Sequence, residues 1–163
     1  MRTNPYIVKP IEGLKRSTRR AIAFLLSSSE MMSTDAMAVF NNLKPNRARE
    51  VRARFDHWID GVQPRDNWFH GWPGHPKYKN CLTFKWKENR QHHRFYGFLF
   101  HPLPHSNAEF QLCVLACHAT KNEWETDDAE LDSINVLRLR ADVLSAISEV
   151  YPDSKSGERK WVQ

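Results

Sequence analysis

The sequence predicts an α+β domain: a small, mostly antiparallel sheet, made of a short N-terminal strand and a three-strand meander, with helices packed on one face. Two observations predict it. Apolar residues recur at helical spacing in the first third of the chain and near its end, and three β-favouring runs follow one another in between. The 163 residues, 40% of them hydrophobic and 26% charged, suit one globular domain. We expect this domain to span residues 1–152 and residues 153–163 to form a flexible tail.

Three helices are expected to follow the short first strand. The strand covers residues 5–11, where prolines near both ends are compatible with an edge position. The first helix covers residues 14–26, because apolar residues recur there at the spacing of one helix face and basic residues lie between them. The other two cover residues 34–40 and 46–59, and each begins at a residue that can cap a helix.

The sequence in the centre of the chain predicts a loop followed by the three-strand meander. Residues 63–80 are rich in Pro, Gly, His and Trp, and they are more numerous than a simple connection needs. The aromatic residues between positions 68 and 78 either stack on nucleic-acid bases or cover the core, and the usual burial of large aromatic side chains favours the core. Strands are expected at three β-favouring segments: residues 81–88, 93–100 and 110–118.

Two helices are expected to end the domain. The first covers residues 126–138, with Thr126 or Asp127 as its cap and acidic residues in its opening turn, where the helix dipole favours them. The second is a short amphipathic helix at residues 141–150.

The charge of the chain is unevenly distributed. The net charge is +5, yet residues 1–54 carry eleven Lys and Arg against four Asp and Glu. Residues 55–121 carry eight against five, and residues 122–163 carry five against ten. A basic body favours an anionic partner, most commonly a nucleic acid, and a solvated basic surface with no such role is an equal alternative.

The composition also predicts a compartment. No apolar run approaches the ~20 residues that a membrane-spanning helix needs, and the first residues lack the apolar core of a signal peptide. The three cysteines, Cys81, Cys113 and Cys117, have no disulfide-framework spacing and fit a reducing environment. We therefore expect a cytoplasmic protein with no membrane partner.

No cofactor and no metal are expected. Cys113 and Cys117 lie four apart on an expected strand and His92 and His93 are adjacent, so neither pair has the spacing of a metal site. The chain also lacks a phosphate-binding loop, a nucleophile elbow and a dinucleotide fingerprint. These absences argue against nucleotide hydrolysis, esterase activity and hydride transfer.

Two stretches of the sequence resemble the RelE/HigB-like toxins of bacterial and phage toxin–antitoxin modules. One is the hairpin from Leu82 to Leu99, and the other is the passage from Cys113 to Leu131. In that family the central strand starts with an arginine followed by alternating aromatic or aliphatic residues, as residues 94–98 do here. Its last strand runs into a Lys-Lys-Thr-x-x-Thr-Pro-like segment, whose place residues 121–127 take.

The resemblance covers about residues 46–138 and implies a RelE/ParE-like fold. It also implies a metal-independent mRNA endonuclease that commonly acts on the translating ribosome and is neutralised by a cognate antitoxin. The chain departs from the pattern at Asn122, which replaces the second lysine, and in the acidic residues around it. Some members place a tyrosine in the active site, and Tyr151 is the candidate for that residue in this chain. These departures leave two alternatives: a ParE-like toxin that binds DNA gyrase, and a degenerate member that only binds a protein partner.

Cleavage through the neighbouring 2′-hydroxyl needs a base, cations around the transition-state phosphate and an acid for the leaving oxygen. Lys85 and Lys87 share one strand face, and the hairpin brings Arg94 beside them with Arg90 at its tip. Arg94 is expected to bind the transition-state phosphate through its planar fork. We also expect Lys85, Lys87, Arg90 and Tyr96 to bind RNA. The alternative is a solvated hairpin with alternating lysines.

Histidines supply the candidates for proton transfer, because an imidazole can serve as acid or base near neutral pH. Alternation puts His92 on the face of Arg94 and Tyr96, and puts His93 on the opposite face. His118, at the end of the third expected strand, and Lys121, which follows that strand, could approach the same edge. The predicted catalytic group is therefore Arg94, His92, His93, Lys121 and His118, and the alternative for each histidine alone is a structural role.

Overall fold

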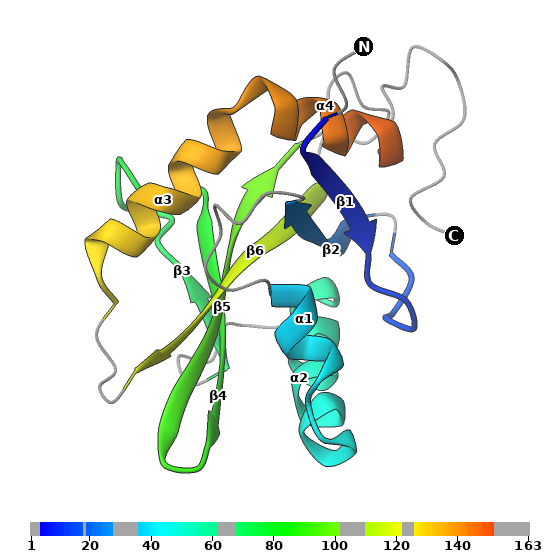
Figure 1. Ribbon diagram of the computed structural model, residues 1–163, viewed down its shortest axis with the longest axis vertical. Helices are drawn as coiled ribbons and strands as arrows, with labels where there is room; N and C mark the ends of the chain where they lie inside the picture. The colour runs from blue at the N-terminus through cyan, green and yellow to red at the C-terminus, as the bar shows by residue number, and fades with distance from the viewer. Residues whose placement is uncertain are drawn as a thin grey trace.

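The computed structural model describes residues 4–17, 19–27, 36–61, 68–101, 110–121 and 126–151, which form six strands and four helices (Figure 1). In chain order these are β1 (Tyr6–Pro10), β2 (Arg20–Ser27), α1 (Ala36–Asn41), α2 (Pro45–Ile59), β3 (Phe69–Gly71), β4 (Cys81–Glu88), β5 (Gln91–Phe100), β6 (Gln111–Lys121), α3 (Asp128–Leu139) and α4 (Ala141–Val150). The chain is thus an α+β protein, as the sequence predicts. No helix within these residues is long and apolar enough to cross a membrane.

The strands form one mixed sheet in the order β1-β2-β6-β5-β4-β3. The meander is confirmed, since β4 pairs with β5 and β5 with β6 in antiparallel register. The expected first strand is confirmed as the edge strand β1. The sheet nevertheless differs from the small, mostly antiparallel one predicted, because β2 joins β6 in parallel register and β3 adds an outer strand.

The prediction of a helix at residues 14–26 is wrong, since most of this segment is β2. Successive residues of β2 point to opposite faces, and both faces are buried: Ala23 and Leu25 join one core cluster, while Ile22 and Phe24 join the other. A strand buried on both faces reads as a continuous apolar run without alternation. Such a run cannot be told from a buried helix by spacing alone.

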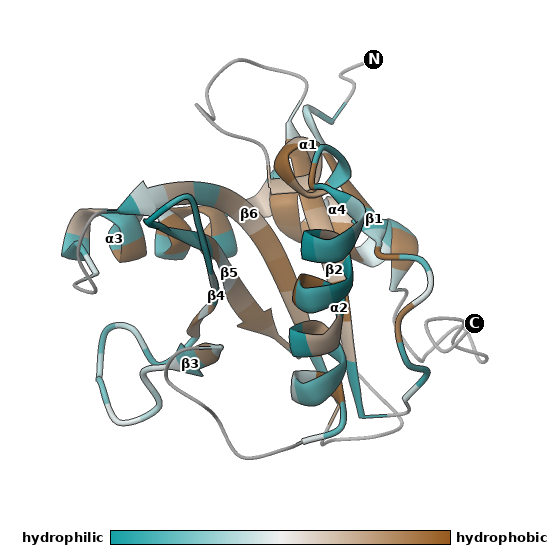
Figure 2. Cartoon of the chain, turned by 90° about the horizontal axis from the view of Figure 1, so that it is seen from below, coloured by the Kyte–Doolittle hydropathy of each residue, from teal (hydrophilic) through white to brown (hydrophobic). Residues whose placement is uncertain are grey.

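Helices cover both faces of the sheet, and the prediction of helices on one face is wrong. Figure 1 shows α3 and α4 along one face and α1 and α2 along the other. Beneath α2 the core is aromatic, with Phe55 packed edge-on against Phe84 at 4.8 Å between ring centroids. Hydrophobic residues run along β5 and β6, between the two helix layers (Figure 2). The second core, under α3 and α4, includes Leu131, Ile134 and Ile147.

The other predicted helices are confirmed. α2, α3 and α4 begin and end within two residues of the predicted bounds, and Asp127 caps α3 by accepting a hydrogen bond from the Ala129 amide. α1 covers most of the helix predicted at residues 34–40, of which the first two residues lie outside the described ones. The expected tail, residues 153–163, also lies outside them.

The described part of the aromatic loop, residues 68–80, covers the core and is tied to α3. Phe69 and Tyr78 are buried in the two core clusters. The Tyr78 hydroxyl donates to Asp132 at 2.9 Å, and Asn135 donates to the Lys77 carbonyl at 2.8 Å. The expectation that large aromatic residues of this loop cover the core therefore holds for these two side chains.

Candidate functional site

The face of the sheet that α3 covers carries three cross-strand rows in which most side chains are polar. Directly paired residues of antiparallel strands share a face, so the register defines the rows. From the hairpin end inward, the rows are Lys87–His92–Lys121, Lys85–Arg94–Ala119 and Thr83–Tyr96–Cys117. We call Lys85, Lys87, His92, Arg94 and Lys121 the basic cluster. It gathers five of the nine residues that the sequence nominates.

The bulge in β5 ends the polar part of the strand. The register shifts between Tyr96 and Gly97, where β5 comes very close to β6. A Cβ atom on Gly97 would lie 2.4 Å from the Val114 carbonyl oxygen, so only glycine fits this position. Beyond the bulge the strand continues with the apolar residues Phe98, Leu99 and Phe100.

Exposure to solvent in the basic cluster increases towards the hairpin. Arg94 is 0% exposed and Lys85 is 6% exposed, whereas Lys87 and the turn residue Arg90 are exposed. His92 is 8% exposed, close to the level of Lys85. The part of the cluster that is open to solvent is therefore the row that contains Lys87.

Arg94 is held by hydrogen bonds to two side chains. Its guanidinium donates to the Tyr96 hydroxyl at 3.3 Å and to the Thr126 hydroxyl just before α3. Burial raises the pKa of Tyr96 to about 12, although the neighbouring Arg94 charge lowers it, so this phenol stays protonated. In this structure Arg94 is therefore enclosed by protein.

Lys121 forms an ion pair with Glu130, from the first turn of α3. Glu130 also interacts with the Tyr96 hydroxyl and raises the pKa of that group. Within the described residues, the buried atoms of this region that have no hydrogen-bond partner include Thr83 Oγ1 and Glu130 Oε2. The first turn of α3 thus brings a carboxylate against the basic cluster.

His92 is the group in the basic cluster that is suited to proton transfer. Burial lowers the pKa of its imidazole, and three neighbouring cations, Lys87 first among them, lower it further. At neutral pH the ring is therefore uncharged, and one of its nitrogens carries a lone pair that accepts a proton.

His93 and His118 lie on the opposite face of the sheet and do not meet His92 in one site. Their ring nitrogens, Nδ1 of His93 and Nε2 of His118, are 3.0 Å apart, and Trp86 stacks on His93 at 5.1 Å between centroids. Burial lowers the pKa of His118 to about 4, helped by His93, and burial likewise lowers the pKa of His93. Among the described residues, no third metal-ligating side chain joins this pair.

The His118 imidazole makes stability depend on pH in a defined direction. Its pKa is about 4 in the folded state and about 6.5 in the unfolded chain, so the unfolded state binds more protons between these values. We expect wild type to lose about 2 kcal/mol of unfolding free energy through this group between pH 7 and pH 4.5. His118→Gln, which keeps a hydrogen-bonding group, should lose correspondingly less in urea denaturation.

The control for this measurement is His101→Gln, which replaces an exposed histidine. It should follow the wild-type dependence of stability on pH. Equal slopes for wild type and His118→Gln would contradict the assignment of a neutral, half-buried His118.

Two residues that close the basic cluster could not be identified from the sequence: Thr126, just before α3, and Glu130, in its first turn. Thr126 has a weak signal, since it occupies the cap region of a predicted helix. Glu130 has no signal beyond its place in an acidic first turn. The candidate tyrosine, Tyr151, is buried at the end of α4.

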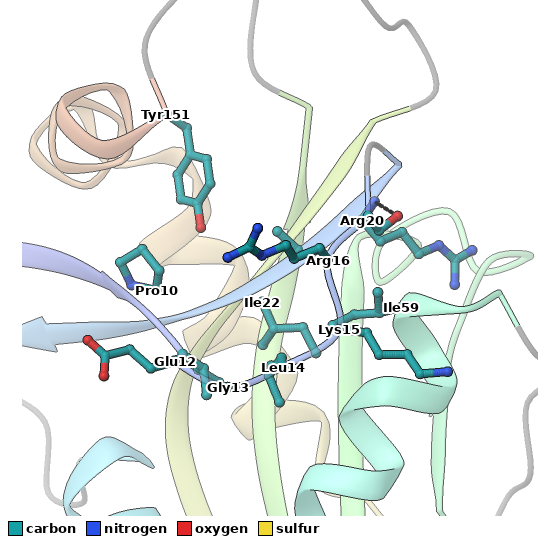
Figure 3. A pocket seen from close by; sticks show the side chains of 13 residues that line it. Pro10, Glu12, Gly13, Leu14, Lys15, Arg16, Arg20, Ile22, Ile59 and Tyr151 are labelled. Atoms are coloured by element: carbon teal, nitrogen blue, oxygen red, sulfur yellow. Dashed lines mark hydrogen bonds between the residues drawn. The ribbon is translucent and has the colours of Figure 1, made fainter. Parts of the chain in front are cut away.

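A separate hollow of about 290 Å³ lies between the β1–β2 connection, Ile59 and Tyr151 (Figure 3). Arg16 extends toward the Tyr151 hydroxyl, while Arg20 extends to the other side, where its guanidinium donates to the Trp58 carbonyl at 2.6 Å. No residue of the basic cluster lines this hollow. The hollow and the basic cluster are distinct features of the described structure.

Comparisons with models of protein families, with curated proteins and with solved structures find no match to this chain. The basic cluster is therefore the feature from which a function is proposed.

Proposed function

We propose that this chain is an endoribonuclease of the toxin type, which cleaves RNA through the neighbouring 2′-hydroxyl at the basic cluster and needs no metal. The row Lys87–His92–Lys121 carries this proposal. A neutral imidazole between two ammonium groups combines a base with the positive charge that a phosphorane-like transition state requires.

In the proposed reaction His92 accepts the proton of the 2′-hydroxyl as the 2′-oxygen attacks phosphorus. The charges of Lys87 and Lys121 stabilise the additional negative charge on the phosphate oxygens. The bond from phosphorus to the 5′-oxygen breaks, and the leaving oxygen takes a proton from the ammonium group of Lys87, the exposed end of the row. The products are a 2′,3′-cyclic phosphate and a 5′-hydroxyl end.

Arg94 and Lys85 form the second row, behind the reacting phosphate. Arg94 contacts Tyr96 and Thr126, and its donor groups hold these partners while its charge adds to the positive field of the cluster. We therefore assign Arg94 a positioning role. The sequence predicts that Arg94 binds the transition-state phosphate. In this proposal Lys87 and Lys121 bind it instead.

The biological setting of the proposal comes from the resemblance to RelE/HigB-like toxins. It comprises cytoplasmic mRNA, cleavage on the ribosome and neutralisation by a cognate antitoxin. The basic hairpin end supports an anionic substrate of this kind, since Lys87 and Arg90 are exposed beside His92.

Expression in a bacterium tests the proposal. Tightly induced wild type should arrest growth and produce new mRNA 5′ ends that carry hydroxyl groups, mapped by primer extension. The double variant Lys87→Gln/Arg90→Gln should lose most of these ends, because it removes the two exposed cations nearest His92.

The matched control is Lys44→Gln/Arg49→Gln, which removes the same charge from exposed positions at the start of α2, on the other side of the sheet. It should behave as wild type. Growth arrest without new mRNA ends would indicate a protein target instead, such as gyrase, and the absence of arrest would contradict a toxin function.

A further inference from the structure

The carboxylate of Glu130 lies where an RNA phosphate would have to bind. It forms an ion pair with Lys121, which is directly opposite His92 across the strands. Its side chain comes from α3, the helix that covers the polar rows. Any phosphate that approaches His92 from this side therefore competes with Glu130 for Lys121.

The contacts of Glu130 resemble those of a bound anion, but only part of its carboxylate is paired. One carboxylate oxygen pairs with Lys121, and the Tyr96 hydroxyl also interacts with this group. The second oxygen is buried and has no hydrogen-bond partner among the described residues. A phosphate has more acceptor oxygens than a carboxylate and presents them in a wider geometry, so it suits several donors at once.

Glu130 can leave this position without disrupting α3. Its side chain is 26% exposed, so a change of rotamer moves the carboxylate toward water. The helix itself is anchored by Leu131, Ile134 and Leu137 on its buried face. Displacement of the carboxylate does not require these apolar contacts to break.

We propose that Glu130 is a built-in competitor for the phosphate site: it holds Lys121 in the free protein, and RNA must displace it to bind. This inference rests on the proposed function, since it names how the same site is regulated. Its consequence is that removal of the Glu130 charge strengthens RNA binding, which is not expected for a residue that only supports the fold.

Asp132 provides a matched control on the same helix. Its carboxylate pairs with Lys77 at 2.9 Å and accepts a hydrogen bond from Tyr78, both in the β3–β4 loop. Asp132→Asn changes the net charge by the same amount as Glu130→Gln. It leaves the contact between Glu130 and Lys121 in place.

The test measures binding of the full chain to a fluorescent 2′-O-methyl oligoribonucleotide, which lacks the attacking hydroxyl and is not cleaved. We expect Glu130→Gln to bind about tenfold more tightly than wild type. For Glu130→Gln, the slope of the logarithm of the association constant against the logarithm of salt concentration should steepen by ~0.7. This is the change expected for one added phosphate contact. Asp132→Asn should bind within about twofold of wild type.

Equal affinities for Glu130→Gln and Asp132→Asn, or weaker binding by Glu130→Gln, would overturn the inference. Glu130→Ala repeats the test with a smaller side chain, and thermal melting of each variant confirms that it is folded. If wild type binds no better than Lys87→Gln/Arg90→Gln, the RNA site itself is wrong, and that result is distinct from failure of the Glu130 inference.

Discussion

Replacing Arg94 by alanine is expected to lower the free energy of unfolding by about 3 kcal/mol. The side chain is fully buried, so its removal leaves a cavity beneath α3. It also removes charge-assisted hydrogen bonds to Tyr96 and Thr126, which leaves their hydroxyl groups short of a donor in a buried place. Relief of repulsion with the neighbouring Lys85 offsets part of this loss. Urea denaturation at pH 7 measures the effect.

Arg90→Ala is the control for this prediction, because Arg90 is an exposed arginine a few residues away in the hairpin turn. Its effect on stability should stay within about 0.5 kcal/mol. Equal stability of the two variants would mean that Arg94 is not enclosed as described. Because Arg94→Ala is expected to weaken the fold, loss of growth inhibition in that variant alone cannot assign a role in cleavage.

The arrangement within the meander could be predicted from the sequence, because it follows from alternation alone. Leu82, Phe84 and Trp86 alternate with Thr83, Lys85 and Lys87, and a short hairpin fixes which residues of β5 face them. The same rule separates His92 from His93, and the structure has the two imidazoles on opposite faces.

Contacts between distant segments could not be predicted. The parallel pairing of β2 with β6 joins residues far apart in the chain, and an apolar run gives no register for it. The enclosure of Arg94 depends on where α3 packs, and alternation does not show whether a polar face is open or covered by a helix. The roles of Thr126 and Glu130 follow from that packing, so they too depend on the tertiary structure.

Replacing His92 by glutamine is expected to lower the RNA cleavage rate about 10²- to 10⁴-fold, the usual contribution of a general base. Glutamine keeps a polar side chain of similar size, so the fold and RNA binding should be retained. The fall of the wild-type cleavage rate at low pH should follow protonation of the His92 imidazole. Since the pKa of His92 is lowered, activity should persist as pH falls below 7 and then decline as the imidazole is protonated.

The most direct measurement compares purified wild type, His92→Gln and His93→Gln in the cleavage of one defined RNA in the presence of a chelator. The two variants make the same chemical change at adjacent positions on opposite faces of β5. We expect His93→Gln to cleave at a rate within about tenfold of wild type and His92→Gln to be nearly inactive. Comparable loss in both variants, or greater loss in His93→Gln, would contradict cleavage at the basic cluster.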